Sequence, residues 1–388
     1  MDTTNGLGGA LYVEYGNVRV LDSAFLINSA HFGGAVYAAS NATLVMEGSP
    51  TSTVFASKLQ LNGNSATEDG GAAYNKGGTL TIRNAVLTVN RTPMQTLLAG
   101  YGGAIYNDGT LTLTNGVFYK NEGRYGGGVF VGNSATGAKA TIDHSSFLSN
   151  TSGNLGGGLY TNDATTAITV TNSAFRSNTA AAGGGIARFN AGLRLVNSSV
   201  TQNSATNGGG LYIGAGPSPT DGGYVHVTSV TFSGNTASSN HGGGVFNIGL
   251  VELYSTTIFS NTNGVFSSNN GNTRFRNSVL QNPGTLNCDG DGTAQISDDS
   301  HNFSTDNSCV LPNSQTGTGL DPKLGPLTLD PVGLTSYHMP LAGSPLIDAG
   351  SNCPALDQRG ASRPNTCDIG AVEYGGLLPR AYIPLIVK

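Results

Sequence analysis

The chain has 388 residues, of which 58 are glycine and only 11% are charged, and its formal net charge is −5. Its 18 basic residues are too few and too scattered for a basic nucleic-acid-binding protein, and its 38% of hydrophobic residues excludes a charged disordered chain. No apolar run reaches the roughly 18 residues of a membrane span, and the abundant glycine, asparagine, serine and threonine residues disfavour long helices.

Two short motifs alternate along the chain from residue 8 to residue 282. The first is a Gly-Gly pair followed by a small, an aliphatic and an aromatic residue, as in residues 102–106. The second is an apolar residue followed three positions later by asparagine, as in Phe118 and Asn121. Successive Gly-Gly motifs start 24 to 37 residues apart, and alternating runs such as residues 110–114 lie between them. Each unit therefore predicts three short strands joined by turns.

A unit this short cannot bury its own apolar face, but stacked units can. Residues 1–282 therefore predict an all-β fold, a right-handed single-stranded parallel β-helix with three sheets. We expect about ten coils, each rising by one strand spacing of about 4.8 Å. Residues 283–374 are expected to form terminal coils and an irregular, disulfide-bonded C-terminal cap, and residues 375–388 a tail.

Asparagine recurs at the last position of the second motif in successive units. This recurrence predicts a ladder of hydrogen-bonded amides along the rod. A second polar column lies three positions before the apolar residue and includes Asn84 and Asn115, with substitutes such as His144. Because asparagine adopts left-handed backbone conformations at low cost, we expect both columns to form coil corners. The predicted ladder comprises Asn28, Asn64, Asn90, Asn121, Asn150, Asn178, Asn203, Asn235 and Asn261.

The aromatic residue of the first motif also recurs at one fixed position of the repeat. It follows an aliphatic residue, so if that residue points inward, strand alternation turns the aromatic ring outward. Such a stripe could stack against sugar rings or a partner protein. A self-stacking ladder that protects the sheet, or inward-facing rings, are the alternatives. The candidate contact stripe comprises Tyr12, Tyr37, Tyr74, Tyr106, Phe130, Tyr160, Tyr212 and Phe246.

The four cysteines lie after the repeats as two local pairs, Cys288 with Cys309 and Cys353 with Cys367. Their even number and local spacing predict two disulfides, against the alternative of four free thiols in a cytosolic protein. A zinc site is disfavoured because no Cys-x-x-Cys spacing occurs. Disulfides predict an extracellular or cell-surface location. Residues 2–9 read as the middle of a coil, so we expect earlier coils and a signal peptide to lie upstream of Met1.

The repeats resemble those of polymorphic outer membrane proteins, which pair Gly-Gly-Ala-Ile with Phe-x-x-Asn, as residues 102–105 and 118–121 do. This resemblance covers roughly residues 1–282 and implies a right-handed β-helix of the pectin-lyase-like superfamily. Residues 344–350, 357–360 and 367–373 resemble the choice-of-anchor Q region that closes many secreted bacterial β-helix proteins.

The candidate catalytic, ligand-binding and metal-binding residues in the sequence are isolated from one another. Asp108 and Asp163 lie two coils apart but out of register, which favours solvated turn residues over a pair of catalytic carboxylates. Arg188, beside Asn190, interrupts the repeat and could bind a uronate carboxylate, although simple sequence drift is the favoured explanation. His144 and His241 have no obvious partner. No cofactor is expected. Residues 289–292 with Asp298 and Asp299 form an acidic, glycine-rich segment that could bind calcium, but the spacing does not match an EF-hand, and a loop held simply by Cys288 and Cys309 is the alternative.

The sequence thus favours a secreted or cell-surface bacterial β-helix rod with a structural, adhesive or glycan-contacting role and without a catalytic constellation. The expected partners are polysaccharide or cell-surface components, and neither nucleic acid nor a membrane span is expected. The alternative is a polysaccharide lyase or glycoside hydrolase on the same fold. A register-matched charged cluster on one outer sheet would distinguish the alternative, and the sequence alone reveals none.

Overall fold

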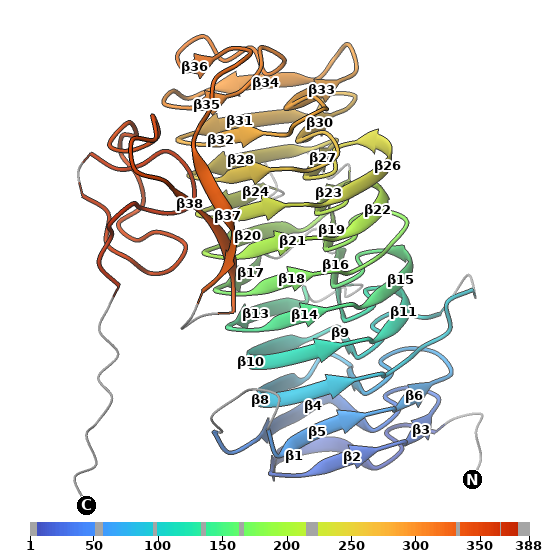
Figure 1. The fold of residues 1–388 in the computed structure, drawn as a ribbon. Coiled ribbons are helices and arrows are strands. Elements are labelled where there is room, and N and C mark those ends of the chain that lie inside the picture. Colours follow the sequence, from blue (N-terminus) through green and yellow to red (C-terminus); the bar gives the residue numbers. More distant parts are fainter. Residues whose placement is uncertain are drawn as a thin grey trace, which may run out of the picture.

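The computed structural model describes residues 6–50, 57–95, 99–132, 137–162, 167–214, 224–330, 334–364 and 366–378. Strands stack along one axis into a rod, with a C-terminal segment lying along its side (Figure 1). Parallel pairing joins 30 strands into one continuous sheet system, and the described residues contain no helix. The architecture is therefore the predicted all-β parallel β-helix, and no described helix exists that could span a membrane.

Each coil, meaning one turn of the solenoid, contributes a strand to each of three sheets. Four long strands each run through two of these sheets, namely β1 (Leu11–Leu21), β4 (Val36–Glu47), β8 (Thr79–Thr88) and β10 (Thr110–Tyr119). Sheet I contains the first parts of β1 and β4, followed by β7 (Ala73–Asn75), β9 (Ile105–Asn107), β12 (Val129–Gly132), β16 (Leu159–Asn162), β19 (Ile186–Phe189), β23 (Leu211–Ile213), β27 (Val245–Asn247), β30 (Val265–Ser267) and β33 (Cys288–Gly290). Sheet II contains the last parts of β1 and β4, the first parts of β8 and β10, and then β13 (Lys139–Asp143), β17 (Ala167–Thr171), β20 (Gly192–Val196), β24 (Val225–Thr228), β28 (Leu250–Tyr254), β31 (Asn272–Arg276) and β34 (Gln295–Asp298).

Sheet III contains β2 (Ala24–Leu26), β5 (Leu59–Asn62), the last parts of β8 and β10, β14 (Ser146–Leu148), β18 (Ala174–Arg176), β21 (Ser199–Thr201), β25 (Thr231–Ser233), β29 (Thr257–Phe259), β32 (Val279–Gln281), β35 (Phe303–Ser304) and β36 (Gln315–Thr316). Short flanking strands lie between sheets III and I, namely β3 (Ser29–Ala30), β6 (Ser65–Ala66), β11 (Glu122–Tyr125), β15 (Thr151–Leu155), β22 (Ser204–Asn207) and β26 (Thr236–His241).

The core is one continuous apolar column inside the coils. Alternate residues of each strand point into it, so that β10, for example, buries Leu111 and Leu113 but not the threonines beside them. Phenylalanine rings stack in successive coils, with ring centroids 4.7 Å apart for Phe118 and Phe147 and 4.5 Å apart for Phe147 and Phe175. Stacking of equivalent residues therefore supplies the burial that a single coil lacks.

Glycine is required at the corner before sheet I because of close backbone approach. The first glycine of the pair has a positive φ, as in Gly102 with φ of 67°. A Cβ on the second glycine, Gly103, would lie 2.2 Å from the carbonyl oxygen of Gly127 in the next coil. The Gly-Gly pairs are thus explained by turn geometry and by coil-to-coil contact.

The predicted amide ladder runs through the rod. In its middle, the Asn150 Oδ1 accepts hydrogen bonds from the backbone N–H and the Nδ2 of Asn121, at 3.0 and 2.9 Å. The Asn150 Nδ2 donates to Asn178 Oδ1 and to the carbonyl of Phe118, both at 3.0 Å. Each amide therefore links two neighbouring coils and also binds a strand end.

The left-handed residues differ in part from the expectation. The second polar column has positive φ, as in Asn84 at 49° and Asn115 at 53°. In the ladder, however, the residue before each asparagine carries the positive φ, as in Val89 at 55° and Ser149 at 53°. The ladder asparagines are therefore selected for their amide hydrogen bonds and not for backbone conformation.

The C-terminal segment turns back from the end of the rod and packs along sheet III (Figure 1). It begins with an antiparallel hairpin of β37 (Leu324–Leu329) and β38 (Ser336–Pro340), and we call described residues 324–376 the arm. Both predicted disulfides are present. The bond between Cys288 and Cys309 lies at the end of the rod, and that between Cys353 and Cys367 lies in the arm.

Candidate functional site

The outer face of sheet I is covered, which corrects the expectation of an exposed aromatic stripe. The aromatic rings do point out of the core and stack, with centroids 5.2 Å apart for Tyr37 and Tyr74 and 4.3 Å apart for Tyr74 and Tyr106. However, side chains of the flanking segments, among them Tyr101 and Tyr125, pack over them. Six of the eight stripe residues are buried as a result, namely Tyr37, Tyr74, Tyr106, Phe130, Tyr160 and Phe246.

The interruption of this ladder at Ala187 is also structural. Phe189, two residues later, packs between Tyr160 and Tyr212, with centroids 6.3 and 5.7 Å away. Arg188 between them points into the rod, is buried, and donates to the backbone carbonyls of Ala191 and Gly214. Burial lowers its pKa to about 10. The suggested uronate contact by Arg188 is therefore wrong, because its guanidinium does not reach the surface.

Sheet III is covered over its C-terminal coils by the arm. Ser199, Thr231 and Thr257 form one outward column in register, and each hydroxyl binds a different part of the arm. Ser199 Oγ accepts from the N–H of Ser336, Thr231 Oγ1 donates to the Gln358 side chain, and Thr257 Oγ1 accepts from the N–H of Ala371. Strands β21 and β25 are consequently buried on both faces.

Sheet II keeps an accessible outer face. Its strands alternate between buried residues and exposed or half-buried ones, as in β13 and β24. Along this face, Arg194, His226, Glu252 and Arg274 occupy one register column in four successive coils. We call these four residues the charged column. Its members lie about 4.8 Å apart from coil to coil, as neighbouring strands do.

Three of the four residues of the charged column, namely His226, Glu252 and Arg274, are linked by ion pairs. Glu252 contacts the Nδ1 of His226 at 2.7 Å and the guanidinium of Arg274 at 3.0 Å. Arg274 also contacts Asp299 at 2.9 Å, and the hydroxyl of Tyr254 donates to Asp299 at 3.4 Å. Burial and the nearby Glu252 raise the pKa of Tyr254, so this phenol stays protonated at neutral pH.

Two arginines on this face stand outside the ion pairs that the described residues form. Arg194 lies one coil before His226, and Arg276 pairs in register with Tyr254. Among the described residues, no ion pair joins either guanidinium to an acid, although Arg276 is half-buried and Arg194 is exposed. The ring of Tyr224 stacks on His226 with centroids 5.9 Å apart. The face therefore offers cationic, acidic and aromatic groups within a few coils.

The contact with Glu252 determines which nitrogen of the His226 ring carries the proton. A carboxylate accepts hydrogen bonds, so Nδ1 carries the proton and Nε2 is left to accept or release one. An oriented imidazole beside a free guanidinium can bind an anionic group and can act as a general base.

Sequence reasoning missed the charged column because its members are unevenly spaced. Arg194 and His226 are 32 residues apart, whereas Glu252 and Arg274 are 22 apart. The variable connections, one of which includes residues 215–223 outside the described part, conceal the register. Counting nine residues back from Asn203, Asn235 and Asn261 would have aligned the first three members, whereas Arg274 lies eight residues before Asn282 in a shortened coil.

The other candidates from the sequence do not assemble into a site. Asp163 lies outside the described residues, so its relation to Asp108 is not defined. His144 contacts its neighbour Asp143 at 2.7 Å, and His241 packs on the ring of Phe266 at 4.3 Å.

The segment considered for calcium has its carboxylates engaged elsewhere. Asp291 accepts from Ser268 and from the backbone of Asn269, both at 2.6 Å. Asp298 accepts from backbone and side-chain donors, among them Asn302 at 2.8 Å. Asp299 pairs with Arg274. These carboxylates therefore hold loops together and point to different partners.

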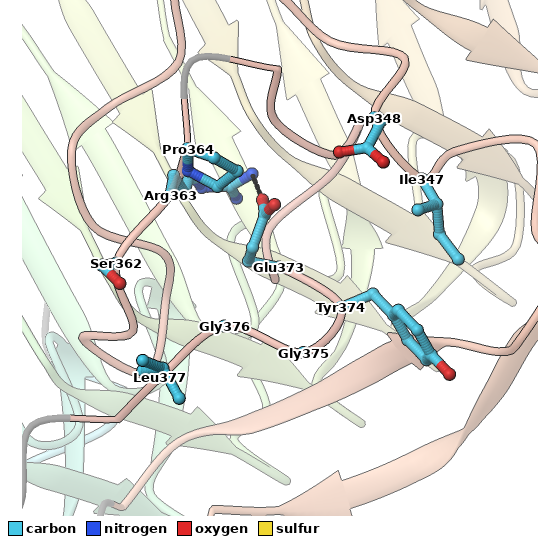
Figure 2. A pocket seen from close by; sticks show the side chains of 10 residues that line it. All are labelled: Ile347, Asp348, Ser362, Arg363, Pro364, Glu373, Tyr374, Gly375, Gly376 and Leu377. Carbon is cyan, nitrogen blue, oxygen red and sulfur yellow. Dashed lines mark hydrogen bonds and ion pairs between the residues drawn. The ribbon is translucent and has the colours of Figure 1, made fainter.

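A second cluster lies in the arm, beside an open pocket of about 520 Å³ (Figure 2). Within the described chain, Asp348, Asp368 and Glu373 bring carboxylate oxygens within 4.8 Å of one another. Asp368 accepts from the backbone N–H groups of Asp348 and Tyr374. Glu373 accepts from the N–H of Asp368 and from the buried Arg363. Burial raises the pKa of Asp368 and of Glu373. This cluster locks the loops of the arm.

No protein-family model matches the chain, and no curated protein matches it. Among solved structures, the crystal structure of pectate lyase Pel9A is similar, with 15% sequence identity and a TM-score of 0.44. The alignment covers 96% of this chain and 98% of that chain.

Proposed function

We propose that this protein is a secreted or cell-surface bacterial β-helix rod that contacts an acidic polysaccharide through the outer face of sheet II. The charged column carries the proposal, because it is a register-matched charged cluster on the face that neither the flanking strands nor the arm covers. The two disulfides support a location outside the cytoplasm.

The geometry suits an extended ligand. The charged column spans four coils, or about 14 Å at the strand spacing, and the rod continues in both directions. Arg194 and Arg276 can pair with carboxylate or sulfate groups of a glycan, and the Tyr254 ring offers an apolar surface to a sugar. A rigid rod holds these groups at fixed positions, which lowers the ordering cost of binding.

Binding to defined polysaccharides tests this proposal. We expect the full chain to bind polygalacturonate or a sulfated glycan with an affinity that falls as salt rises. The substitution Arg194→Ala should weaken binding about tenfold or more, as loss of a charge-assisted hydrogen bond does. Arg176→Ala on sheet III, where the side chain is also exposed, is the matched control. Equal binding by both variants would contradict the proposal.

A second candidate function is polysaccharide lyase activity, and the orientation of His226 by Glu252 supports it. In β-elimination, the imidazole Nε2 would take the proton from the carbon next to a uronate carboxylate. A carbon–carbon double bond then forms, the glycosidic C–O bond breaks, and the leaving oxygen takes a proton from the Tyr254 hydroxyl or from water. Arg194 would neutralise the carboxylate during this step.

Ultraviolet absorbance of unsaturated products separates the two functions. Pectin, alginate and glycosaminoglycans are the substrates to test. If the lyase candidate holds, His226→Gln abolishes turnover while glycan binding remains. If none of these polymers is cleaved although one binds, the chain is a binding protein and the lyase candidate fails.

A further inference from the structure

Threonine residues form a two-dimensional array on the outer face of sheet II. They lie on β4, β8, β10, β13 and β17, in the coils that precede the charged column. One column of the array continues into Arg194, a second lies two residues earlier on the strands, and a third lies two residues later. We call these eight residues the threonine array. The columns are Thr81, Thr112, Thr141 and Thr169, then Thr43, Thr79 and Thr110, and finally Thr114.

The repetition of threonine on this face is not a requirement of the backbone. Threonine is common in strands, but later coils place Arg194, His226 and Glu252 in the same column. In the coils of the array, the outward column of sheet III also holds different residues, such as Val117 and Ser146. The repetition is therefore explained better by what this face contacts than by strand formation alone.

The hydroxyl groups of the array are open to a ligand. Thr110 and Thr141 are exposed, and the other six residues are half-buried. In the part of the chain that the structure describes, no hydrogen bond engages any of the eight hydroxyls, whereas the neighbouring Thr171 donates to Asp143 at 2.6 Å. The array thus presents unengaged hydroxyl groups on an accessible face.

The array repeats regularly in two directions. Strands of neighbouring coils lie about 4.8 Å apart, and alternate residues of one strand lie about 6.6 Å apart. Strands β8, β10 and β13 pair without a shift in register at these positions, and stacking of this kind favours a flat sheet. The β-branched side chain of threonine has few rotamers. Its hydroxyl and methyl groups are therefore held in place before a ligand binds.

A rigid lattice of hydroxyl and methyl groups suits a ligand that is itself periodic. One neutral hydrogen bond contributes only about 1 kcal/mol, because it replaces a bond to water, so many contacts must form together. The two repeats of the array are close to the spacings between oxygen atoms on the faces of hexagonal ice, and water orders around methyl groups. Sugars are instead bound largely by aromatic rings and charged groups, which the eight side chains lack.

We propose that the threonine array binds the surface of ice crystals. Water molecules bound to the hydroxyls and ordered around the methyl groups join the crystal lattice, so that the rod adsorbs and slows growth at that place. The array and the charged column share no residue, so this proposal does not depend on the polysaccharide contact.

Adsorption to slowly growing ice tests the proposal. Growing ice excludes ordinary solutes, so we expect the full chain to be enriched in the ice fraction and to lower the freezing point below the melting point. Thr112→Lys and Thr141→Lys should each abolish both effects, because a long side chain holds the neighbouring threonines away from the crystal. Thr88→Lys is the matched control, since Thr88 is a half-buried outward residue of sheet III, and it should adsorb as the unchanged chain does.

Circular dichroism of each variant verifies that the fold is retained. Loss of adsorption in both array variants and not in Thr88→Lys supports the proposal. Exclusion of the unchanged chain from ice, or equal enrichment of all variants, overturns it. Binding to crystalline cellulose without adsorption to ice also overturns it, because the array would then recognise a polymer surface.

Discussion

The amide ladder makes a quantitative prediction about stability. Asn150 is completely buried, and its side chain takes part in four hydrogen bonds with Asn121, Asn178 and Phe118. Leucine has a similar size but can make none of them. Each lost bond costs about 1 kcal/mol net, and stranded buried groups cost more. We therefore expect Asn150→Leu to lower the free energy of unfolding by about 4–6 kcal/mol.

The end of the ladder provides the comparison. Asn28 is partly buried, and its side chain makes one ladder bond, to Asn64. Asn28→Leu should therefore cost only about 1 kcal/mol, because water satisfies the freed groups. Urea unfolding of both variants, followed by circular dichroism, measures the difference. Equal losses at the two positions, or a loss below about 1 kcal/mol at Asn150, would refute the view that buried amide bonding stabilises the rod.

Two further predictions concern burial and coil contact. Burial raises the pKa of Asp69 to about 6, so the folded chain binds this proton more tightly than the unfolded chain, and stability is lost as pH rises from about 4 to 6. Asp69→Asn should remove this loss of stability, which amounts to about 3 kcal/mol above pH 6. Urea unfolding of both proteins across this pH range checks the prediction. A difference in unfolding free energy between the two proteins that does not change with pH would contradict it. Gly103→Ala should destabilise by more than about 2 kcal/mol, because its Cβ would lie 2.2 Å from a carbonyl oxygen. Gly292→Ala, which meets nothing within 4 Å, is the control, and similar melting temperatures for the two variants would be the opposing result.

The fold could be predicted because its determinants are local and recur in each coil. The Gly-Gly motif marks a corner at which a side chain would clash, and Asn121 and its equivalents each bond to the neighbouring coil. A pattern repeated at one phase therefore reports both the turn and the stacking.

The surfaces could not be predicted in the same way, because they depend on the variable segments between the motifs. The aromatic ladder is covered by Tyr101 and Tyr125 from such segments. The charged column depends on a register that uneven connections hide. The arm contacts sheet III through pairs such as Thr231 and Gln358, 127 residues apart, and no local pattern encodes contacts at that separation.

The most direct test of the central claim is hydroxyl-radical footprinting of the full chain with and without polygalacturonate or a sulfated glycan. The account predicts protection of His226 and Tyr254 on sheet II by the glycan that binds, and no change at Tyr119 on sheet III. Protection confined to the arm, for example at Tyr374, or at sheet III would contradict the claim that the outer face of sheet II contacts the polysaccharide.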